Sequence, residues 1–389
     1  MRILLSNKFY YLRGGDCVYT LNLESLLKKY NHEVAIFAMQ HPKNIDTYYS
    51  SYFPSEVSFH SLNRKNFIEL FLRPYGTREV KEKFNLLLDD FHPDIVHLNN
   101  IHSQLSPIIA QIAYQRKIKV IWTLHDYELL FSRYDGSHIR NLRVIDKIRV
   151  LKKRYIKNFI AYGESLKWGH KKLEKYTNLF ICPSQFMTDK MIQGGINPQK
   201  LHMLYNFIDV SKTKRDNYHD KNDFYCYIGR LSHEKGVKTL VDAAFQLPYK
   251  LKIIGEGPLT EQLMKQANGS SNIEFLGYRH WSEIKEIVSR ACFSVIPSEW
   301  HEVFGLVIAE AQCLGTPVLG ANIGGIPELI ENKKNGMLFK SGNIEDLTDK
   351  IQQMFHTEFD YKKIAEESQN RYSAENYYNE IMKIYTNID

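Results

Sequence analysis

The second half of the chain alternates short apolar runs with amphipathic stretches. The runs are continuous and bounded by glycine or polar residues, which predicts buried strands, and the stretches between them repeat apolar positions at helical spacing. Strands that alternate with helices indicate a parallel, doubly wound α/β sheet. The predicted strands are residues 224–230, 250–257, 273–277, 292–298 and 317–321, with helices after Gly236, from Leu259, from Trp281 and over 304–314.

The first half shows the same alternation less regularly. Residues 1–7 predict a buried strand, a turn follows at Gly14 and Gly15, and residues 16–29 predict a helix packed on a sheet. The turn lacks the GxGxxG pattern, so a dinucleotide fingerprint is absent. Further strands are predicted at 32–39, 94–100, 119–126, 179–184 and 200–209, and 43–93 is irregular and aromatic-rich apart from a helical pattern at 80–91.

A hydrophilic stretch at 211–223, which has no apolar periodicity, marks a domain boundary. A chain of 389 residues is also too long for one small core and suits two domains. The amphipathic stretch that ends the chain predicts a helix with Ser373 as its N-cap. The predicted divisions are an N-terminal domain over 1–208, a linker over 209–223, a C-terminal domain over 224–370 and a final helix over 371–389.

Composition excludes several classes of protein. The 43% hydrophobic and 24% charged residues are ordinary for a globular protein, and no apolar run approaches the roughly 20 residues that a membrane span needs. The first residues lack an apolar core and a small-residue cleavage site, so we expect no signal peptide. The five cysteines form no CxxC pair, which indicates neither a zinc site nor a disulfide framework, and a reducing cytoplasm is the expected location.

The net charge of +7 is mild but unevenly distributed. From Arg133 to Lys175 the chain carries 13 Lys or Arg against 4 Asp or Glu, on an amphipathic pattern. A solvated basic helix face is one interpretation; contact with an anionic membrane surface or an anionic acceptor is the other, and we favour it. No RNA- or DNA-binding motif accompanies the charge, so we expect no nucleic-acid partner.

The stretch PSEWHEVFGLVIAE, residues 297–310, joins a polar turn to a buried helix. The helix carries a single charge, Glu310, and a carboxylate inside an apolar helix requires a partner. Glu302 would lie about 80° away from it if both were helical, so the two do not share a face. We place Glu302 in the loop before the helix and Glu310 further in, where both reach one ligand and Gly305 lets the backbone come close. A solvated loop acid with a buried acid paired to arginine is an equally weighted alternative.

Two cations precede a predicted helix in GRLSHEKG, residues 229–236. Arg230 and Lys235 beside a helix N-terminus make an anion site suited to a diphosphate, although the motif alone fits two surface cations equally well. The turns GEGPL at 255–259 and GGIPEL at 324–329 lie on the same carboxyl edge of the predicted sheet, where nucleotides bind. Because the sequence shows no DxD motif or His/Asp metal cluster, we expect these cations and backbone N–H groups, and no metal, to neutralise the diphosphate.

Polar residues also end two predicted strands of the first half. His97 and Asn99 stand at the end of one strand, and His125 and Asp126 end another. Open parallel sheets bind ligands at these ends. A lone histidine at a strand end is nevertheless more often structural or a helix cap.

At this point the sequence resembles a family 4 glycosyltransferase of the GT-B fold, of the type that builds bacterial surface polysaccharides. The matching motifs are RLSHEKG, GEGPL, PSEWHEVFGLVIAEAQCLGTPVL and GGIPELI, in this order. Glu302 and Glu310 match the family's E-x7-E motif. The matches cover most of residues 224–340, whereas the first half matches more loosely, through its Gly-Gly turn, TLHD and CPS.

The resemblance implies two Rossmann-like, doubly wound parallel-sheet domains that face a cleft, with the last helix returning to the first domain. The N-terminal domain would bind the acceptor and the C-terminal domain the sugar nucleotide. The family retains the anomeric configuration and needs no metal. The chain departs from the family mainly at 43–80 and 133–175, which are acceptor-side regions, so the acceptor stays open.

The resemblance also implies roles for single residues. Glu302 would hydrogen-bond the donor sugar, Glu310 would take the ribose hydroxyls, and His125 would sit near the reacting sugar. Arg230 and Lys235 would grip the diphosphate. The residues implied to be catalytic are His125, Arg230, Lys235 and Glu302, and those implied to bind the donor are Gly14, Gly15, Gly229, Arg230, Lys235, Gly255, Gly257, Tyr278, Val303, Phe304, Gly305, Leu306 and Glu310.

We therefore expect a retaining, metal-independent hexosyltransferase (EC 2.4) without a cofactor. It would move a sugar from a UDP- or GDP-sugar to a glycan or lipid-linked oligosaccharide in surface polysaccharide synthesis, in the cytoplasm or peripherally at the inner face of the membrane. Another GT-B enzyme, such as an epimerase or phosphorylase, is disfavoured by the E-x7-E pair together with RLSHEKG. A non-catalytic sugar-nucleotide-binding protein is disfavoured by the intact charged residues, and an oxidoreductase by the missing GxGxxG.

Overall fold

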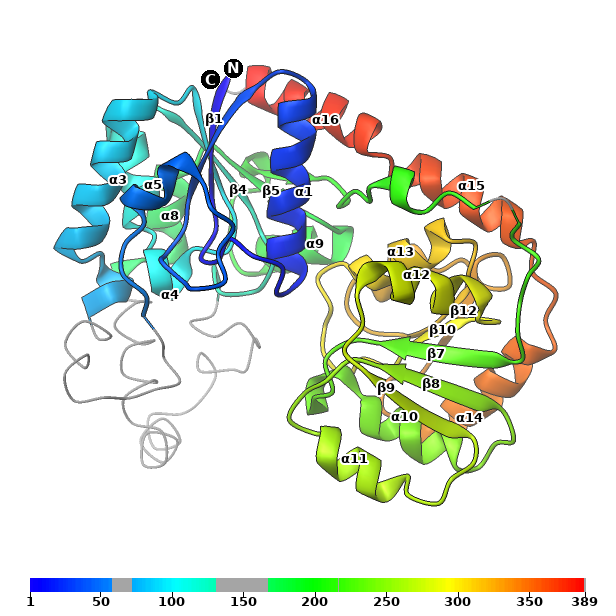
Figure 1. The fold of residues 1–389 in the computed structure, drawn as a ribbon. Helices are drawn as coiled ribbons and strands as arrows, with labels where there is room; N and C mark the ends of the chain where they lie inside the picture. Colours follow the sequence, from blue (N-terminus) through cyan, green and yellow to red (C-terminus); the bar gives the residue numbers. More distant parts are fainter. Residues whose placement is uncertain (58–71, 131–166, 216, 388–389) are drawn as a thin grey trace. The chain divides into compact units, whose positions relative to one another are not determined.

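The chain forms two units, each built on one six-stranded parallel sheet, which confirms the predicted doubly wound α/β class. The computed structural model describes residues 1–57, 72–130, 167–215 and 217–387 (Figure 1). Most of the basic segment at 133–175 lies outside these residues, so its predicted helix and surface contact stay predictions. The first unit comprises Met1–Pro183, Thr188–Leu204 and Tyr378–Asp389, and the second comprises Ser184–Met187 and Tyr205–Tyr377.

The first sheet has the strand order β2-β1-β3-β4-β5-β6. Helices α3, α5 and α8 pack side by side in sequence order, and Figure 1 shows them across the sheet from α1. The strands are β1 (Arg2–Ser6), β2 (Glu33–Phe37), β3 (Ile95–Leu98), β4 (Lys119–Thr123), β5 (Leu179–Cys182) and β6 (Leu201–Met203). The helices are α1 (Gly15–Lys29), α3 (Arg78–Phe91), α4 (His102–Leu105), α5 (Ile108–Gln115), α8 (His170–Tyr176) and α9 (Gln185–Gln193).

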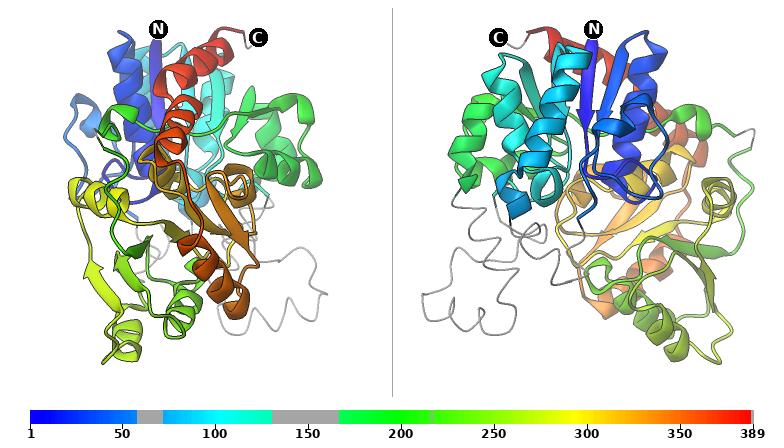
Figure 2. Two further views of the ribbon diagram at one scale, coloured as in Figure 1. Left: turned by 90° about the vertical axis from the view of Figure 1, so that its right-hand side faces the viewer. Right: turned by 60° about the vertical axis from the view of Figure 1, so that its left-hand side comes forward.

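The second sheet has the strand order β12-β11-β10-β7-β8-β9. Helices α12 and α13 cover one of its faces, and α10, α11 and α14 the other; Figure 2 shows both sheets from two further directions. The strands are β7 (Phe224–Ile228), β8 (Lys250–Ile254), β9 (Ile273–Gly277), β10 (Ser294–Ile296), β11 (Val318–Ala321) and β12 (Gly336–Phe339). The helices are α10 (Val237–Ala244), α11 (Thr260–Gln266), α12 (Trp281–Arg290), α13 (Leu306–Cys313), α14 (Ile344–Phe355), α15 (Tyr361–Arg371) and α16 (Ala374–Asn387).

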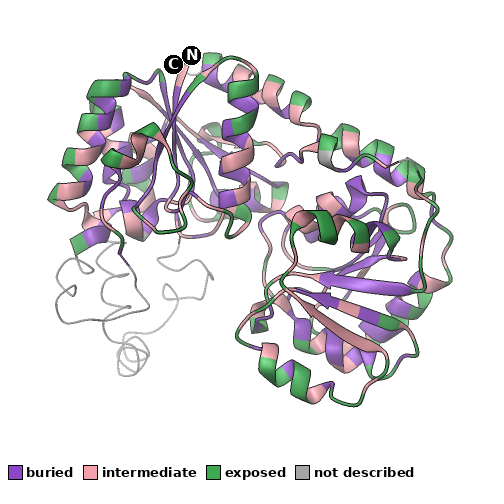
Figure 3. Ribbon diagram, in the orientation of Figure 1, coloured by how far each residue is buried: buried purple, intermediate pink, exposed green. Residues whose placement is uncertain are grey.

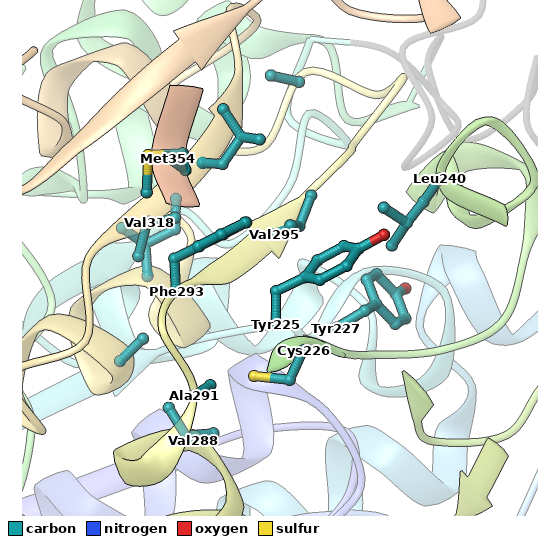
Figure 4. Close-up of a cluster of buried hydrophobic side chains, with 14 of the residues drawn as sticks. Tyr225, Cys226, Tyr227, Leu240, Val288, Ala291, Phe293, Val295, Val318 and Met354 are labelled. Atoms are coloured by element: carbon teal, nitrogen blue, oxygen red, sulfur yellow. The ribbon is translucent and has the colours of Figure 1, made fainter. Parts of the chain in front are cut away.

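Most strands of both sheets are buried, and exposed residues gather on the outer faces of the helices (Figure 3). Helices cover both faces of each sheet, which explains why the strands read as continuous apolar runs instead of alternating ones. In the second unit, the Tyr225 ring stacks on Phe293 at 5.3 Å, near Val295 and Met354 (Figure 4). A fully buried Phe side chain such as Phe293 contributes about 1.5–3 kcal/mol.

Several parts of the fold, helix α9 among them, differ from the sequence prediction. The strand predicted over 200–209 ends at Met203, because the following apolar residues cover the C-terminal helices: the Phe207 ring lies 4.5 Å from Tyr377, and the Ile208 N–H donates to the Tyr372 carbonyl at 2.9 Å. Strand β12 and helices α14 and α15 were not predicted at all.

Helix α16 begins where the sequence predicts. The Asn376 N–H donates to Ser373 Oγ at 3.1 Å, which confirms Ser373 as the N-cap. The last turns of α16 belong to the first unit, where the Tyr378 ring stacks on Tyr30 at 3.6 Å. Among the helices in the described ranges, none is both long and apolar enough to cross a membrane.

Candidate functional site

The strand order of the second sheet reverses at β7, which pairs with β8 on one side and with β10 on the other. The chain leaves β7 and β10 in loops at the carboxyl edge of the sheet. In open α/β sheets, ligands bind at this point of reversal. The loop after β7 carries Arg230 and Lys235, and the loop after β10 carries Glu302, so three predicted residues come to the reversal point.

Lys235 and Glu302 join these two loops. Lys235 Nζ donates to Glu302 Oε1 at 2.6 Å, and Ser298 Oγ donates to the same oxygen at 3.0 Å. The side chains are 35% and 16% exposed, so the ion pair is reachable from solvent. The family resemblance implies that Lys235 binds the diphosphate and Glu302 the sugar, and their pairing with each other was not predicted.

The loop that carries Glu302 is fixed by its backbone. The Gly325 N–H donates to the Glu302 carbonyl at 2.7 Å, and Ser184 Oγ donates to the Val303 carbonyl at 2.6 Å. Gly305 has φ 106°, a left-handed conformation that glycine adopts without strain, and α13 starts at the next residue. Glu302 therefore lies in the loop before the helix, as predicted.

Three successive backbone N–H groups in this loop have no hydrogen-bond acceptor in the described part of the chain. They belong to Val303, Phe304 and Gly305. The side chains of Val303 and Phe304 are apolar and buried. The polar groups that these residues can offer a ligand therefore belong to the backbone. Unpaired N–H groups at a helix N-terminus form an anion-binding site when an anion is supplied.

Glu310 lies inside α13, and burial raises its pKa to about 7. Its carboxyl group makes no hydrogen bond or ion pair with any described residue. The alternative in which Glu310 pairs with an arginine therefore finds no support among these residues. A carboxyl group in this environment requires a polar partner, and a ligand hydroxyl group is suited to that place.

Glu310 shares a small pocket with Trp281, the first residue of α12. The indole Nε1 of Trp281 is buried and has no hydrogen-bond partner in the described residues. The other lining residues are apolar: Ile228, Ile284, Val288, Val307, Ala311 and Leu314. Sequence reasoning missed Trp281, although its position at the start of the helix after β9 was a signal.

Arg230 is exposed, and its guanidinium group makes no hydrogen bond or ion pair with the described residues. Its carbonyl accepts from the Tyr227 hydroxyl at 2.9 Å, which holds the turn after β7. Gly255 permits a close approach of the neighbouring loop, because a Cβ there would lie 2.0 Å from the Gly229 carbonyl oxygen. This contact explains the glycine, and donor binding by Gly229, Gly255 and Gly257 stays a prediction.

Tyr278 lies further from the reversal point than the other predicted donor residues. It follows β9, two strands from β7, which is about 10 Å in a sheet. The side chain is 62% exposed, and its N–H donates to Glu256 Oε1 at 3.3 Å. The structure therefore leaves its predicted contact with the donor untested.

In the first unit, Gly14 is the N-cap of α1 and Gly15 is its first residue. Gly14 has an extended backbone, with φ −154°, so the turn does not need glycine for a left-handed conformation. Asp16 adds negative charge in the first turn, and one of its carboxylate oxygens is buried without a hydrogen-bond partner in the part of the chain that the structure describes. Phosphate binding at this turn stays a prediction.

His125 follows β4, at the carboxyl edge of the first sheet. Its Nε2 lies 3.0 Å from Asn99 Oδ1, and its ring lies 4.8 Å from that of Tyr19. Burial lowers the pKa of His125, so the imidazole is neutral at neutral pH. His97, the other predicted strand-end histidine, is completely buried and hydrogen-bonded on both nitrogens.

The first unit also brings together three possible metal ligands that the sequence did not reveal as a group, and the expectation of no metal stays a prediction. His102 Nε2 lies 3.9 Å from Asp126 Oδ1, and His102 Nδ1 lies 4.0 Å from Glu128 Oε2. One ligand atom from each of the three residues lies within 4.8 Å of the others. Burial lowers the pKa of His102 to about 4, so its imidazole is neutral, the form that binds metals. The group offers nitrogen and oxygen ligands of the kind that divalent cations accept.

Comparison with known proteins assigns a family to both halves of the chain. A family model described as Glycosyltransferase Family 4 matches residues 13–212, and one described as Glycosyl transferases group 1 matches residues 209–371. An uncharacterized 42.6 kDa protein in the cps region of Klebsiella pneumoniae is 28% identical over 350 residues, which cover 85% of this chain and 87% of the relative.

Two solved structures show the same fold. Sucrose-phosphate synthase from Thermosynechococcus elongatus superposes with a TM-score of 0.73 and 17% identity, covering 99% of this chain and 98% of the other. Anabaena Alr3699/HepE in complex with UDP-glucose superposes with a TM-score of 0.67 and 19% identity, covering 99% of each chain. With a family model that matches more than half of its residues, this chain belongs to glycosyltransferase family 4 and has the GT-B fold.

Proposed function

We propose that this nucleotide-sugar glycosyltransferase moves a hexose from a UDP- or GDP-sugar to a glycan or lipid-linked oligosaccharide, with retention of configuration and without a metal. The observation that carries the donor site is the half-buried carboxyl group of Glu310, which has no protein partner among the described residues. Ribose hydroxyl groups would supply the missing hydrogen bonds.

The diphosphate of the donor would bind at the N-terminus of α13. The N–H groups of Val303, Phe304 and Gly305 are unpaired among the described residues, and Lys235 and Arg230 supply positive charge. Glu302 would exchange its bond to Lys235 for a hydroxyl group of the donor sugar. Its carboxylate would then fix the sugar, while Lys235 turns to the phosphate.

The chemistry follows from where charge develops. Cleavage of the glycosidic C–O bond leads to an oxocarbenium-like state and leaves negative charge on the diphosphate. Lys235, Arg230 and the N-termini of α10 and α13 interact more strongly with this charge than with the intact donor. These contacts therefore lower the barrier without requiring a nucleophile from the protein.

The acceptor class rests on a relative and on the charge pattern of the sequence. The Klebsiella relative is encoded in a cps region, which supports a role in surface polysaccharide synthesis. The 13 Lys or Arg against 4 Asp or Glu in 133–175 favour an acceptor at an anionic membrane surface. The protein should accordingly co-sediment with anionic vesicles at low salt. Equal sedimentation with neutral vesicles, or none with either, would remove the membrane from the proposal.

A donor panel tests the function directly. The purified protein is incubated with UDP-glucose, UDP-galactose, UDP-N-acetylglucosamine or GDP-mannose in EDTA, and binding and hydrolysis are measured. We expect one donor to bind and to be hydrolysed slowly, and the variant Glu302→Ala to lose hydrolysis. Glu299→Ala is the matched control, because this acid lies in the same loop and bonds to Thr239 instead of Lys235.

The outcomes of the panel separate the alternatives. Product analysis that shows an epimerised nucleotide sugar, or a sugar phosphate formed with inorganic phosphate, would replace the transferase by another GT-B enzyme. Binding of a donor without turnover by any acceptor or water would favour a non-catalytic sugar-nucleotide-binding protein. Absence of binding to all four donors would overturn the proposed donor class.

A further inference from the structure

A chain of buried hydrogen bonds runs behind His125 in the first unit. His97 on β3 lies 2.6 Å from the Tyr385 hydroxyl through Nδ1 and 2.7 Å from Thr123 Oγ1 through Nε2. Thr123 Oγ1 lies 3.2 Å from the Tyr19 hydroxyl on α1. The chain thus joins the last helix, two central strands and the first helix, and His97 and Tyr385 are 288 positions apart in the sequence.

Hydrogen-bond satisfaction gives this chain one direction. Burial lowers the pKa of His97 to about 3, so its neutral ring has one donor and one acceptor nitrogen. The Tyr385 hydroxyl is buried, burial keeps it protonated by raising its pKa, and His97 is its one hydrogen-bond partner in the described residues. It must therefore donate to His97 Nδ1, since the reverse arrangement would bury an unsatisfied O–H group. Nε2 then carries the proton and donates to Thr123, which donates to Tyr19.

The last residue of this hydrogen-bond network, Tyr19, contacts His125. The rings of Tyr19 and His125 contact edge to face at 4.8 Å and 61°. His125 Nε2 lies 3.0 Å from Asn99 Oδ1, and Asn99 Nδ2 donates to the Ser6 carbonyl at 3.4 Å, which orients the amide oxygen towards the histidine. His125 Nε2 must therefore be the donor, and Nδ1 keeps its lone pair when the ring is neutral.

We infer that Tyr385 and His97 are positioning residues for His125. Their hydrogen bonds hold Thr123 and, through it, Tyr19, whose ring contacts that of His125, so that Nδ1 of His125 is available as the acceptor for a substrate hydroxyl group. The inference rests on the proposed function and on the role that the family resemblance implies for His125, next to the reacting sugar. It gives the last helix a part in the active site, although its own side chains need not touch a substrate.

A pair of tyrosines on α16 allows a matched test. Tyr385→Phe removes the hydroxyl group that sets the tautomer of His97. Tyr378→Phe is the control. Tyr378 lies on the same helix, and its hydroxyl group also forms a hydrogen bond with a histidine, His32 Nε2 at 2.8 Å, but this pair is not part of the hydrogen-bond network that includes His97. Thr123→Val, which keeps the shape of the side chain, breaks the chain at a second place if Tyr385→Phe does not fold.

The kinetic readout uses the donor identified by the panel. We expect Tyr385→Phe and Thr123→Val to lower kcat about tenfold, in line with the loss of one buried hydrogen bond that orients a reacting group, and to leave the donor KM unchanged. Tyr378→Phe should stay within about twofold of the wild type. Equal values of kcat for all three variants and the wild type would overturn the inference.

Nitrogen-15 NMR of histidine-labelled protein gives a readout that does not need activity. In the wild type, His97 and His125 should both appear as Nε2–H tautomers at neutral pH. In Tyr385→Phe, His97 should become a mixture of tautomers and the His125 signals should shift. A wild-type His97 protonated on Nδ1, or His125 signals that ignore the variant, would reject the positioning role even where the donor panel succeeds, and a failed donor panel would leave this test intact.

Discussion

The two sheets differ in whether the polar side chains at their carboxyl edges are hydrogen-bonded within the protein. In the first unit, His97, Thr123 and Asn99 are buried, and each is held by hydrogen bonds from other protein groups. In the second unit, the side chains of Arg230 and Glu310 have no hydrogen-bond or ion-pair partner among the described residues. Arg230 is exposed and reaches solvent, whereas the half-buried carboxyl group of Glu310 lacks a protein partner and is suited to a polar ligand.

This difference separates positioning from binding. In the first unit, hydrogen bonds fix the orientation of one neutral histidine, His97. In the second unit, charged side chains and backbone N–H groups have no hydrogen-bond partner among the described residues. Lys235 and Glu302 lie between these two cases, because their ion pair is partly exposed and its exchange with solvent costs little. We expect the second site to respond to charge and the first to geometry.

Removal of the Lys235 charge should have the largest effect. We expect Lys235→Ala to lower kcat/KM by about 10²- to 10³-fold, because one of the groups that stabilise the leaving diphosphate is lost. Lys238→Ala is the control: it removes a cation three residues away that pairs with Asp242 on the outside of α10. Initial rates across donor concentrations measure both. If the two variants lost the same activity, general positive charge would explain the effect, and the diphosphate contact would be wrong.

The affinity for the donor should change about tenfold with pH. Burial raises the pKa of Glu310 to about 7, and acceptance of two ribose hydroxyl groups favours the ionised form. Affinity for the nucleotide should therefore rise about tenfold between pH 6 and pH 8 and be lost as the pH falls through 7. Calorimetric titration measures it, with Glu310→Gln expected to bind weakly and without this dependence.

The same carboxyl group links pH to stability, with the opposite sign. Its pKa in the folded protein lies above the unfolded value of 4.5, so the folded state binds more protons between about pH 4.5 and pH 7. This group therefore lowers the free energy of unfolding as the pH rises through that window, by no more than about 3 kcal/mol. Urea unfolding of Glu310→Gln should lack this contribution. An identical pH profile in both proteins would show that Glu310 is not buried in apolar surroundings.

Apolar periodicity was sufficient to predict much of the second sheet. Helix α12, for example, starts at Trp281 as predicted, and Glu302 lies in the loop before α13. Helix α14 was missed despite a clear signal, since it has apolar residues at helical spacing and the Asn343 side chain caps its first turn. Local pattern thus gives the elements and the loops between them.

Contacts between distant residues could not be predicted in this way. The bond between Lys235 and Glu302 depends on β7 lying beside β10, which is a property of strand order and not of either motif. His97 reads as a ligand-side residue because it is near a strand end, whereas the return of α16 places Tyr385 against it. Tertiary arrangement decides which polar residues are paired, and therefore which are left for a ligand.

Removal of divalent metal should have the smallest effect on activity. The experiment tests whether activity depends on the cationic residues of the second unit or on a metal in the first unit. We expect EDTA to leave kcat/KM unchanged, because in the proposed function Lys235, Arg230 and backbone N–H groups of the second unit would neutralise the diphosphate. The group of His102, Asp126 and Glu128 in the first unit is the alternative, since its atoms have a spacing that a divalent cation could bridge. Activity lost in EDTA, restored by Mn²⁺ and absent in His102→Gln would place the metal there. Activity that survives both EDTA and His102→Gln would show that the cations of the second unit are sufficient for the leaving group.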